Sequence, residues 1–337
     1  MANSQFIIYS SSDPGNGSDQ PGLITGQAGD LIRVLDKVLI NGYTGKAAAG
    51  WTKPVATVSN ASTYKNGTGS GMTLHVQDNG PNVTSTFKEA WLTGWESCTA
   101  VSSTVGTGNG QFPTPAQLLT TGHVVARKST TADGTGRSWT IFADAYTFYM
   151  FILTGDTAGN YLACAFGDFF ALKGSSDAYR CHLMGRGTEN SGAALINSDW
   201  DNIVSFGVTT SNNGLWCPRS FGGGSANSIQ IERMGDIGKT NVGSGGANVP
   251  AAGLLQTPNG PDNSFYLAPM WVGELTATCM RGRYRGVYHV CHPIASFADG
   301  QTFQGSGDYA GKTFQIVKQG LSAGYWAIET SNTVETN

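Results

Sequence analysis

The chain has 337 residues, of which 13% are charged and 47 are glycine, and its formal net charge is −3. This length allows one large domain or two to three ordinary ones. The near-neutral charge excludes a global field that would attract nucleic acid or an anionic membrane. Because no run of 18 apolar residues and no signal-peptide pattern is present, we expect a soluble, non-exported protein without a membrane span.

Residues 28–40 form the clearest helical pattern in the sequence. Apolar residues recur there at helical spacing, charged residues fall on the other face, and Asn41-Gly42 supplies a stop signal. We expect this amphipathic helix to dock on the rest of the protein, with an inter-subunit position as the alternative. Its predicted core consists of apolar helix residues and a tryptophan in the following loop: Leu31, Leu35, Val38, Leu39 and Trp51.

Most of the remaining sequence predicts short β-strands. The segments are rich in aromatic and β-branched residues and are separated by Gly, Asn, Asp or Pro. The predicted fold is therefore mainly β, a sandwich or barrel-like body with one docked N-terminal helix and long Gly/Pro-rich connections. In residues 146–153 both alternating sets are apolar, which indicates either a central strand or a strand with one face covered by another subunit. Tyr149 and Phe151 are the interface candidates under the second interpretation.

Two stretches poor in large apolar residues divide the chain. Residues 99–120 and 234–263 are punctuated by Gly and Pro, as linkers are. They separate an N-terminal helix-plus-strand region (1–98), a central β region (121–233) and a C-terminal β region (264–337). The second stretch is long for a loop inside one domain, so we expect an extended contact segment.

Several polar clusters could offer ligands to a metal ion or carboxylates for a catalytic pair, but a structural role is the favoured interpretation for each, so we predict no metal, cofactor or catalytic residue. The six cysteines lack a CxxC pattern and are expected to be reduced and buried, although Cys279 and Cys291 flank a predicted hairpin and could bridge in an oxidising medium. The polar clusters considered are Asp13, Asn16, Ser18 and Asp19; Asp199 and Asp201; Cys181 and His182; and His289, Cys291 and His292.

Three arginines form the most pronounced basic cluster. On a regular strand Arg281, Arg283 and Arg285 would project to one face. In a nearly neutral protein, carboxylates or backbone carbonyls of a neighbouring subunit are the favoured partners, with solvent or nucleic acid as the alternatives. We therefore expect replacement of these arginines to weaken assembly more than folding.

Several segments together resemble a known family. They are "LIRVLDKVLINGYTGKAAAGWTKP", "RKSTTADGTGRSWTIFADAYTFYMFI", "FGDF", "RGRYRGVYHVCHPIASFADGQTFQG" and "GKTFQIVKQGLSAGYWAIETSNTV". In this order they resemble uncharacterised structural proteins of tailed bacteriophage virions.

The resemblance implies a function in a virus particle. The expected role is that of a non-enzymatic structural protein in the tail, the tail tip or baseplate, the head-to-tail region, or in capsid decoration. The expected partners are other virion proteins and copies of the chain itself, with synthesis in the bacterial cytoplasm. A virion-mounted module for glycan binding or host recognition is the alternative, and a depolymerase is a third option that would need paired carboxylates across a groove.

Overall fold

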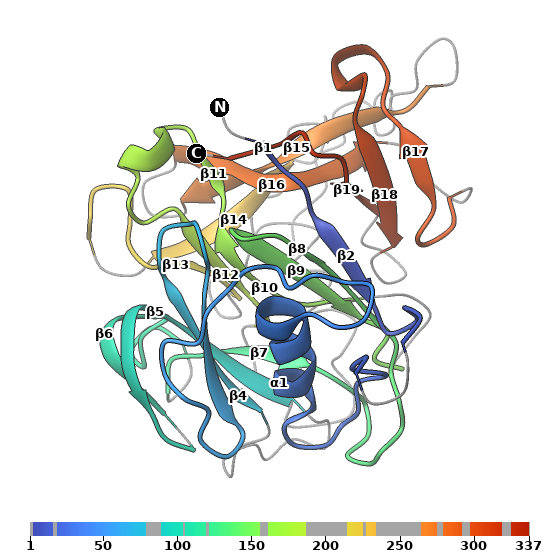
Figure 1. The fold of residues 1–337 in the computed structure, drawn as a ribbon. Helices are drawn as coiled ribbons and strands as arrows, with labels where there is room; N and C mark the ends of the chain where they lie inside the picture. The colour runs from blue at the N-terminus through green and yellow to red at the C-terminus, as the bar shows by residue number, and fades with distance from the viewer. Residues whose placement is uncertain are drawn as a thin grey trace, which may run out of the picture.

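Strands and turns account for most of the described chain (Figure 1). This confirms the prediction of a mainly β protein, and the sheets formed by the described residues are open and do not close into a barrel. The computed structural model describes residues 3–15, 19–78, 89–103, 105–118, 121–155, 161–186, 214–224, 227–233, 264–274, 279–291, 297–318 and 325–336.

The larger sheet runs through the middle of the molecule and continues into the C-terminal strands (Figure 1). Its strands follow the order β17-β18-β19-β16-β15-β14-β13-β12-β10-β9-β8-β2, and β11 pairs with β16. The bounds are β2 (Ile7–Ser10), β8 (Trp139–Ala143), β9 (Thr147–Ile152), β10 (Tyr161–Asp168), β11 (Phe170–Ala171), β12 (Cys181–Met184), β13 (Leu215–Cys217), β14 (Asn227–Arg233), β15 (Tyr266–Glu274), β16 (Cys279–Cys291), β17 (Thr302–Gln304), β18 (Thr313–Lys318) and β19 (Tyr325–Glu329).

The smaller sheet consists of strands from the first part of the chain, in the order β3-β4-β5-β6, with β7 paired to β5. A short pair, β1 with β20, joins the two ends of the chain. The bounds are β3 (Ala61–Lys65), β4 (Thr73–Asp78), β5 (Glu89–Val101), β6 (Gly106–Phe112), β7 (Val124–Arg127), β1 (Asn3–Ser4) and β20 (Val334–Glu335). Two short 3-10 turns, Gly174–Ser176 and Gly307–Tyr309, complete the described elements.

The predicted helix is α-helical over only half its length. α1 (Asp30–Leu35) continues as a π-helix, η1 (Asp36–Asn41). In the π-helical part the amide of Gly42 bonds to the carbonyl of Lys37, five residues earlier. The carbonyls of Val38 and Leu39, near the end of the helix, accept hydrogen bonds from the loop amides of Ala49 (2.9 Å) and Trp51 (3.0 Å), which tie the helix to the following loop. No described helix has the length and apolar character needed to cross a bilayer.

The helical segment lies between the smaller sheet and strands β8 to β10 (Figure 1). The indole N–H of Trp51 donates to the carbonyl of Asp144 at 2.7 Å, and its ring packs edge-on to Phe148. The residues predicted to form the core of the helix are all buried in this shared apolar cluster: Leu31, Leu35, Val38, Leu39 and Trp51.

Replacing Leu35 by Ala is expected to lower the free energy of unfolding by about 2–4 kcal/mol, because the buried side chain leaves a cavity between the helix and the sheets. Urea denaturation of wild type and variant measures the difference. The control is Arg33→Ala in the same helix, whose side chain is 41% exposed and whose ion pair with Asp30 is worth little. Equal midpoints for Leu35→Ala and wild type would contradict the packing described here.

Strand β9 is buried on both faces by its own chain. Phe148, Met150 and Ile152 belong to the cluster that contains the helix, whereas Tyr149 and Phe151 belong to a second cluster with C-terminal strands. The ring of Trp326 packs edge-on to both Tyr149 (6.4 Å) and Phe151 (5.7 Å). The prediction of Tyr149 and Phe151 as interface residues is therefore wrong: an intramolecular strand covers the face that was assigned to another subunit.

The three predicted regions share much of their apolar core. One apolar cluster combines residues of the first two regions, a second combines residues of all three, and a smaller third one lies within the C-terminal region. Residues 99–120, predicted as a linker, include the end of β5 and all of β6, so this stretch belongs to the smaller sheet. Residues 234–263 lie outside the described residues.

Candidate functional site

Two of the three arginines predicted at an interface are buried inside the protein. Arg281 donates to the Asp177 carboxylate at 2.9 Å with two nitrogens, and to Glu274 at 3.0 Å. Arg285 donates to the two carboxylate oxygens of Asp144 at 2.9 and 2.6 Å. These side chains are 0–1% exposed, so their carboxylate partners belong to the same chain and the interface prediction is wrong for both.

The prediction assumed a regular strand, whereas the backbone of β16 is irregular. Its pairing with β15 shifts register between Pro269 and Trp271 and again between Val272 and Gly273. Such bulges break the alternation of faces on which the prediction relied. Tyr284 and Arg285 are neighbours in sequence and both are buried. Arg283 alone keeps a partly exposed side chain, and it forms an ion pair with Glu335.

Three exposed apolar residues are connected through their backbone to the buried Arg281 or to its partner Glu274. Leu172 is 56% exposed, Phe221 42% and Met280 38%. The amide of Leu172 bonds to the carbonyl of Arg281, and the amide of Phe221 bonds to Glu274, the partner of that arginine. We call Leu172, Phe221 and Met280 the Leu172 patch. Neighbouring exposed apolar residues of this kind are typical of contact surfaces.

Asp13 and Asp19, of the first predicted polar cluster, have structural roles. Asp13 accepts hydrogen bonds from the Tyr43 hydroxyl (2.6 Å) and the Ser10 amide (2.9 Å), and Asp19 accepts from Lys37 (2.9 Å) and the Thr44 amide (2.7 Å). Both aspartates thereby fix the loop that follows the helix. The described residues contain no group of three or more His, Cys, Asp or Glu that could hold a metal ion. Asn16, Ser18, Asp199, Asp201, His292 and the side chain of Cys291 lie outside the described residues.

The described cysteines are free thiols. Cys98, Cys164, Cys181 and Cys217 are buried, and Cys279 is partly exposed. Cys279 and Cys291 do not flank a hairpin, because they are the first and last residues of the single strand β16. At about 3.3 Å per residue this places them some 40 Å apart, too far for a disulfide.

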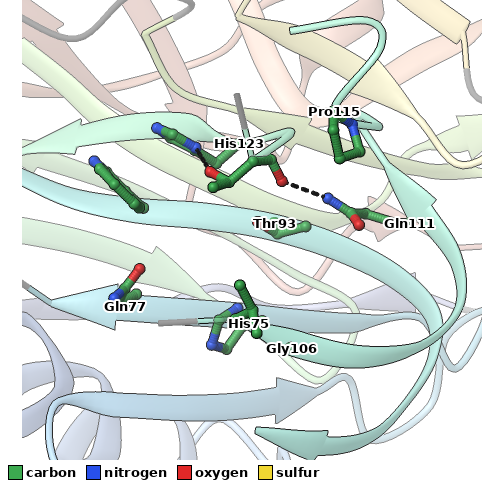
Figure 2. A pocket seen from close by; sticks show the side chains of 10 residues that line it. His75, Gln77, Thr93, Gly106, Gln111, Pro115 and His123 are labelled. Atoms are coloured by element: carbon green, nitrogen blue, oxygen red, sulfur yellow. Dashed lines mark hydrogen bonds between the residues drawn. The ribbon is translucent and has the colours of Figure 1, made fainter. Parts of the chain in front are cut away.

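A polar pocket opens on the face of the smaller sheet that points away from the core. Strand alternation places Leu74 and Val76 in the core and His75 and Gln77 on the opposite face of β4. The register sets His75 opposite Thr93 and Gln77 opposite Trp91 on β5. Figure 2 shows His75, Gln77, Thr93, Gln111 and His123 on neighbouring strands of this face. With Trp91 they line a hollow of about 220 Å³. We call His75, Gln77, Trp91, Thr93, Gln111 and His123 the His75 pocket.

Hydrogen bonds and stacking hold the walls of the His75 pocket in place. The His123 ring stacks on Trp91 with centroids 4.2 Å apart, and its Nδ1 lies 2.5 Å from the Thr121 hydroxyl. The amide of Gln111 donates to the carbonyls of Thr121 (2.8 Å) and Gly122 (3.0 Å) (Figure 2). The pocket is therefore built by fixed side chains.

Three buried polar atoms of residues that line the pocket have no partner within the described part of the chain: His75 Nε2, Gln77 Oε1 and Trp91 Nε1. Leaving such a buried group unsatisfied costs about 1–3 kcal/mol, so buried polar groups normally find partners. Burial lowers the pKa of His75 to about 4 and that of His123 to about 3. Both imidazoles are therefore neutral near pH 7, and no Asp, Glu, Lys or Arg is among the described residues that line the hollow.

The sequence analysis missed this pocket. The alternation in "TLHVQD" was a usable signal, since it places a His and a Gln on the face opposite two aliphatic residues. That Trp91 and Thr93 lie across from them depends on the pairing of β4 with β5.

In comparisons with known proteins, no family model and no curated protein matches the chain.

Proposed function

We propose that the chain is a non-enzymatic structural component of a tailed bacteriophage particle, made in the bacterial cytoplasm, which acts through contacts with other virion proteins and with copies of itself. The resemblance of its sequence segments to structural proteins of tailed phages supports this proposal. The low share of charged residues also supports it, because surfaces buried between subunits are depleted in charge.

The Leu172 patch is the observation that carries the proposal furthest. Its three apolar side chains sit on backbone that is fixed by the buried Arg281, Asp177 and Glu274 network. A rigid apolar patch can dock without losing much conformational freedom, which is what assembly of many subunits requires. Arg283, on the same strand as Met280, and its partner Glu335 on β20 are both partly exposed and supply a polar site.

The double variant Leu172→Ser, Met280→Ser is expected to fold like wild type and to be depleted in purified phage particles. Exposed positions tolerate such changes at a cost of about 0.5 kcal/mol, whereas the contact with a neighbouring subunit would lose its apolar area. Quantitative mass spectrometry of particles, relative to the major capsid protein, measures incorporation. The matched control is Leu153→Ser, an exposed leucine at the end of β9.

Two results would refute parts of this proposal. Purified particles that lack the wild-type chain would refute its role as a virion component. Wild-type incorporation of the double variant would refute the assignment of the Leu172 patch as the contact surface. The copy number obtained from the same spectra distinguishes hundreds of decorating copies from the few tens or fewer of a tail part.

A further inference from the structure

The unpartnered atoms of the His75 pocket differ in their hydrogen-bonding character. Trp91 Nε1 is only a donor, Gln77 Oε1 is only an acceptor, and His75 Nε2 is one or the other according to its tautomer. An anion would satisfy the indole N–H but would repel the amide oxygen, and a cation would do the reverse. A hydroxyl group both donates and accepts. The pocket is therefore matched to an uncharged ligand with hydroxyl groups.

The other walls of the pocket favour a ring with an apolar face. Val105 and Pro115 border the same hollow as the polar groups. One face of the Trp91 ring is already covered by His123 at 4.2 Å, so a flat base cannot insert between these two rings. A volume of about 220 Å³ is below the range of about 300–1,000 Å³ that is usual for drug-sized ligands. It suits one small ring.

We propose that the His75 pocket binds a single neutral sugar residue, such as the terminal residue of a glycan, through hydrogen bonds from its hydroxyl groups to Trp91 Nε1, Gln77 Oε1 and His75 Nε2. The aliphatic face of the sugar lies against Val105 and Pro115. The inference goes beyond the proposed structural function and does not rest on it, because the residues that carry it belong to one chain and binding is tested on the purified protein.

A second hollow near the C-terminal strands serves as an internal comparison. It is larger, about 720 Å³, and is lined by Tyr266, Phe303, Asp308 and Tyr309 among others. Tyr266 is exposed, and none of the described residues that line this hollow has a buried polar side-chain atom that lacks a partner. The hollow therefore offers aromatic surface without the unsatisfied groups that specify a ligand in the His75 pocket.

The test is a titration of the purified chain with methyl glycosides of glucose, galactose, mannose, N-acetylglucosamine and rhamnose, followed by saturation-transfer NMR and calorimetry. We expect saturable binding of at least one glycoside. Trp91→Phe, which keeps the ring and removes the indole N–H, should weaken this binding about tenfold or more. The matched control is Trp95→Phe on the same strand, which also removes a buried unpartnered N–H but does not line the hollow, and should leave binding unchanged.

If Trp91→Phe does not fold, His75→Phe takes its place, because it also removes a hydrogen-bonding group and keeps a ring. Four results would overturn the proposal: no glycoside shows saturable binding, the pocket variant binds like wild type, binding is lost in Tyr266→Ser instead, or adenosine or uridine saturates the pocket in preference to the glycosides. None of these results bears on whether the chain is present in phage particles.

Discussion

The Arg285→Met variant is expected to have a free energy of unfolding about 3–5 kcal/mol lower than that of the wild-type protein. Arg285 is buried and bonds to both carboxylate oxygens of Asp144, and its Nε donates to the carbonyl of Glu335 at 3.1 Å. Asp144 in turn accepts from the Ser4 hydroxyl at 2.7 Å. Removing the guanidinium leaves a buried carboxylate without its counter-charge and loosens the pairing of the two chain ends.

Urea denaturation measures this loss. We expect the slope of the free energy of unfolding against urea concentration to be the same in variant and wild type. The matched control is Arg283→Met, two residues away on β16. Because the Arg283 side chain is 28% exposed and its partner Glu335 is 35% exposed, we expect a cost below about 1 kcal/mol. Equal stability of Arg285→Met and Arg283→Met would contradict the burial of the Arg285 pair. The sequence predicted that replacing these arginines weakens assembly more than folding. For the buried Arg281 and Arg285 we now expect the larger effect on folding stability.

The Lys128→Met variant is expected to lose a comparable amount of stability, about 3–5 kcal/mol, at pH 8. Lys128 and Asp78 form an ion pair in which both side chains are 0% exposed. The same aspartate accepts from the Leu31 amide at 2.7 Å, so it caps the first turn of α1, where Gly29 has no side chain to do so. Lys128 also donates to the carbonyl of Gln27 at 2.6 Å. The pair therefore joins the smaller sheet to the helix.

The loss in Lys128→Met is expected to be smaller at pH 5 than at pH 8. Burial already raises the pKa of Asp78, and removal of the ammonium group raises it further. A carboxyl whose pKa is higher in the folded than in the unfolded state stabilises the fold at low pH and loses this contribution as the pH rises through the folded pKa. Urea midpoints at the two pH values measure the effect.

The double variant Asp78→Asn, Lys128→Met is the control for this pH dependence. The amide oxygen of Asn can still accept from the Leu31 amide but cannot ionise. We therefore expect the double variant to be more stable at pH 8 than Lys128→Met alone and to lack the added pH dependence. A double variant with the same pH dependence as Lys128→Met would show that another group is responsible.

Local patterns in the sequence were sufficient to predict which faces are apolar. The spacing of Leu31, Leu35, Val38 and Leu39 places them on one side of a helical turn, and the structure buries all four. Both alternating sets of β9 are apolar, and both faces of that strand are buried. These properties follow from backbone periods of about 3.6 and 2 residues, which depend on the chain geometry alone.

The partners of those faces were decided only by the tertiary structure. Trp326 covers Tyr149 and Phe151, the loop amides of Ala49 and Trp51 bond to the end of the helix, and carboxylates of the same chain pair with the buried Arg281 and Arg285. The His75 pocket exists because the register of β4 and β5 sets Gln77 opposite Trp91. Each of these contacts depends on pairing between segments that are distant in sequence. Local periodicity cannot specify that pairing, because many registers bury the same apolar faces.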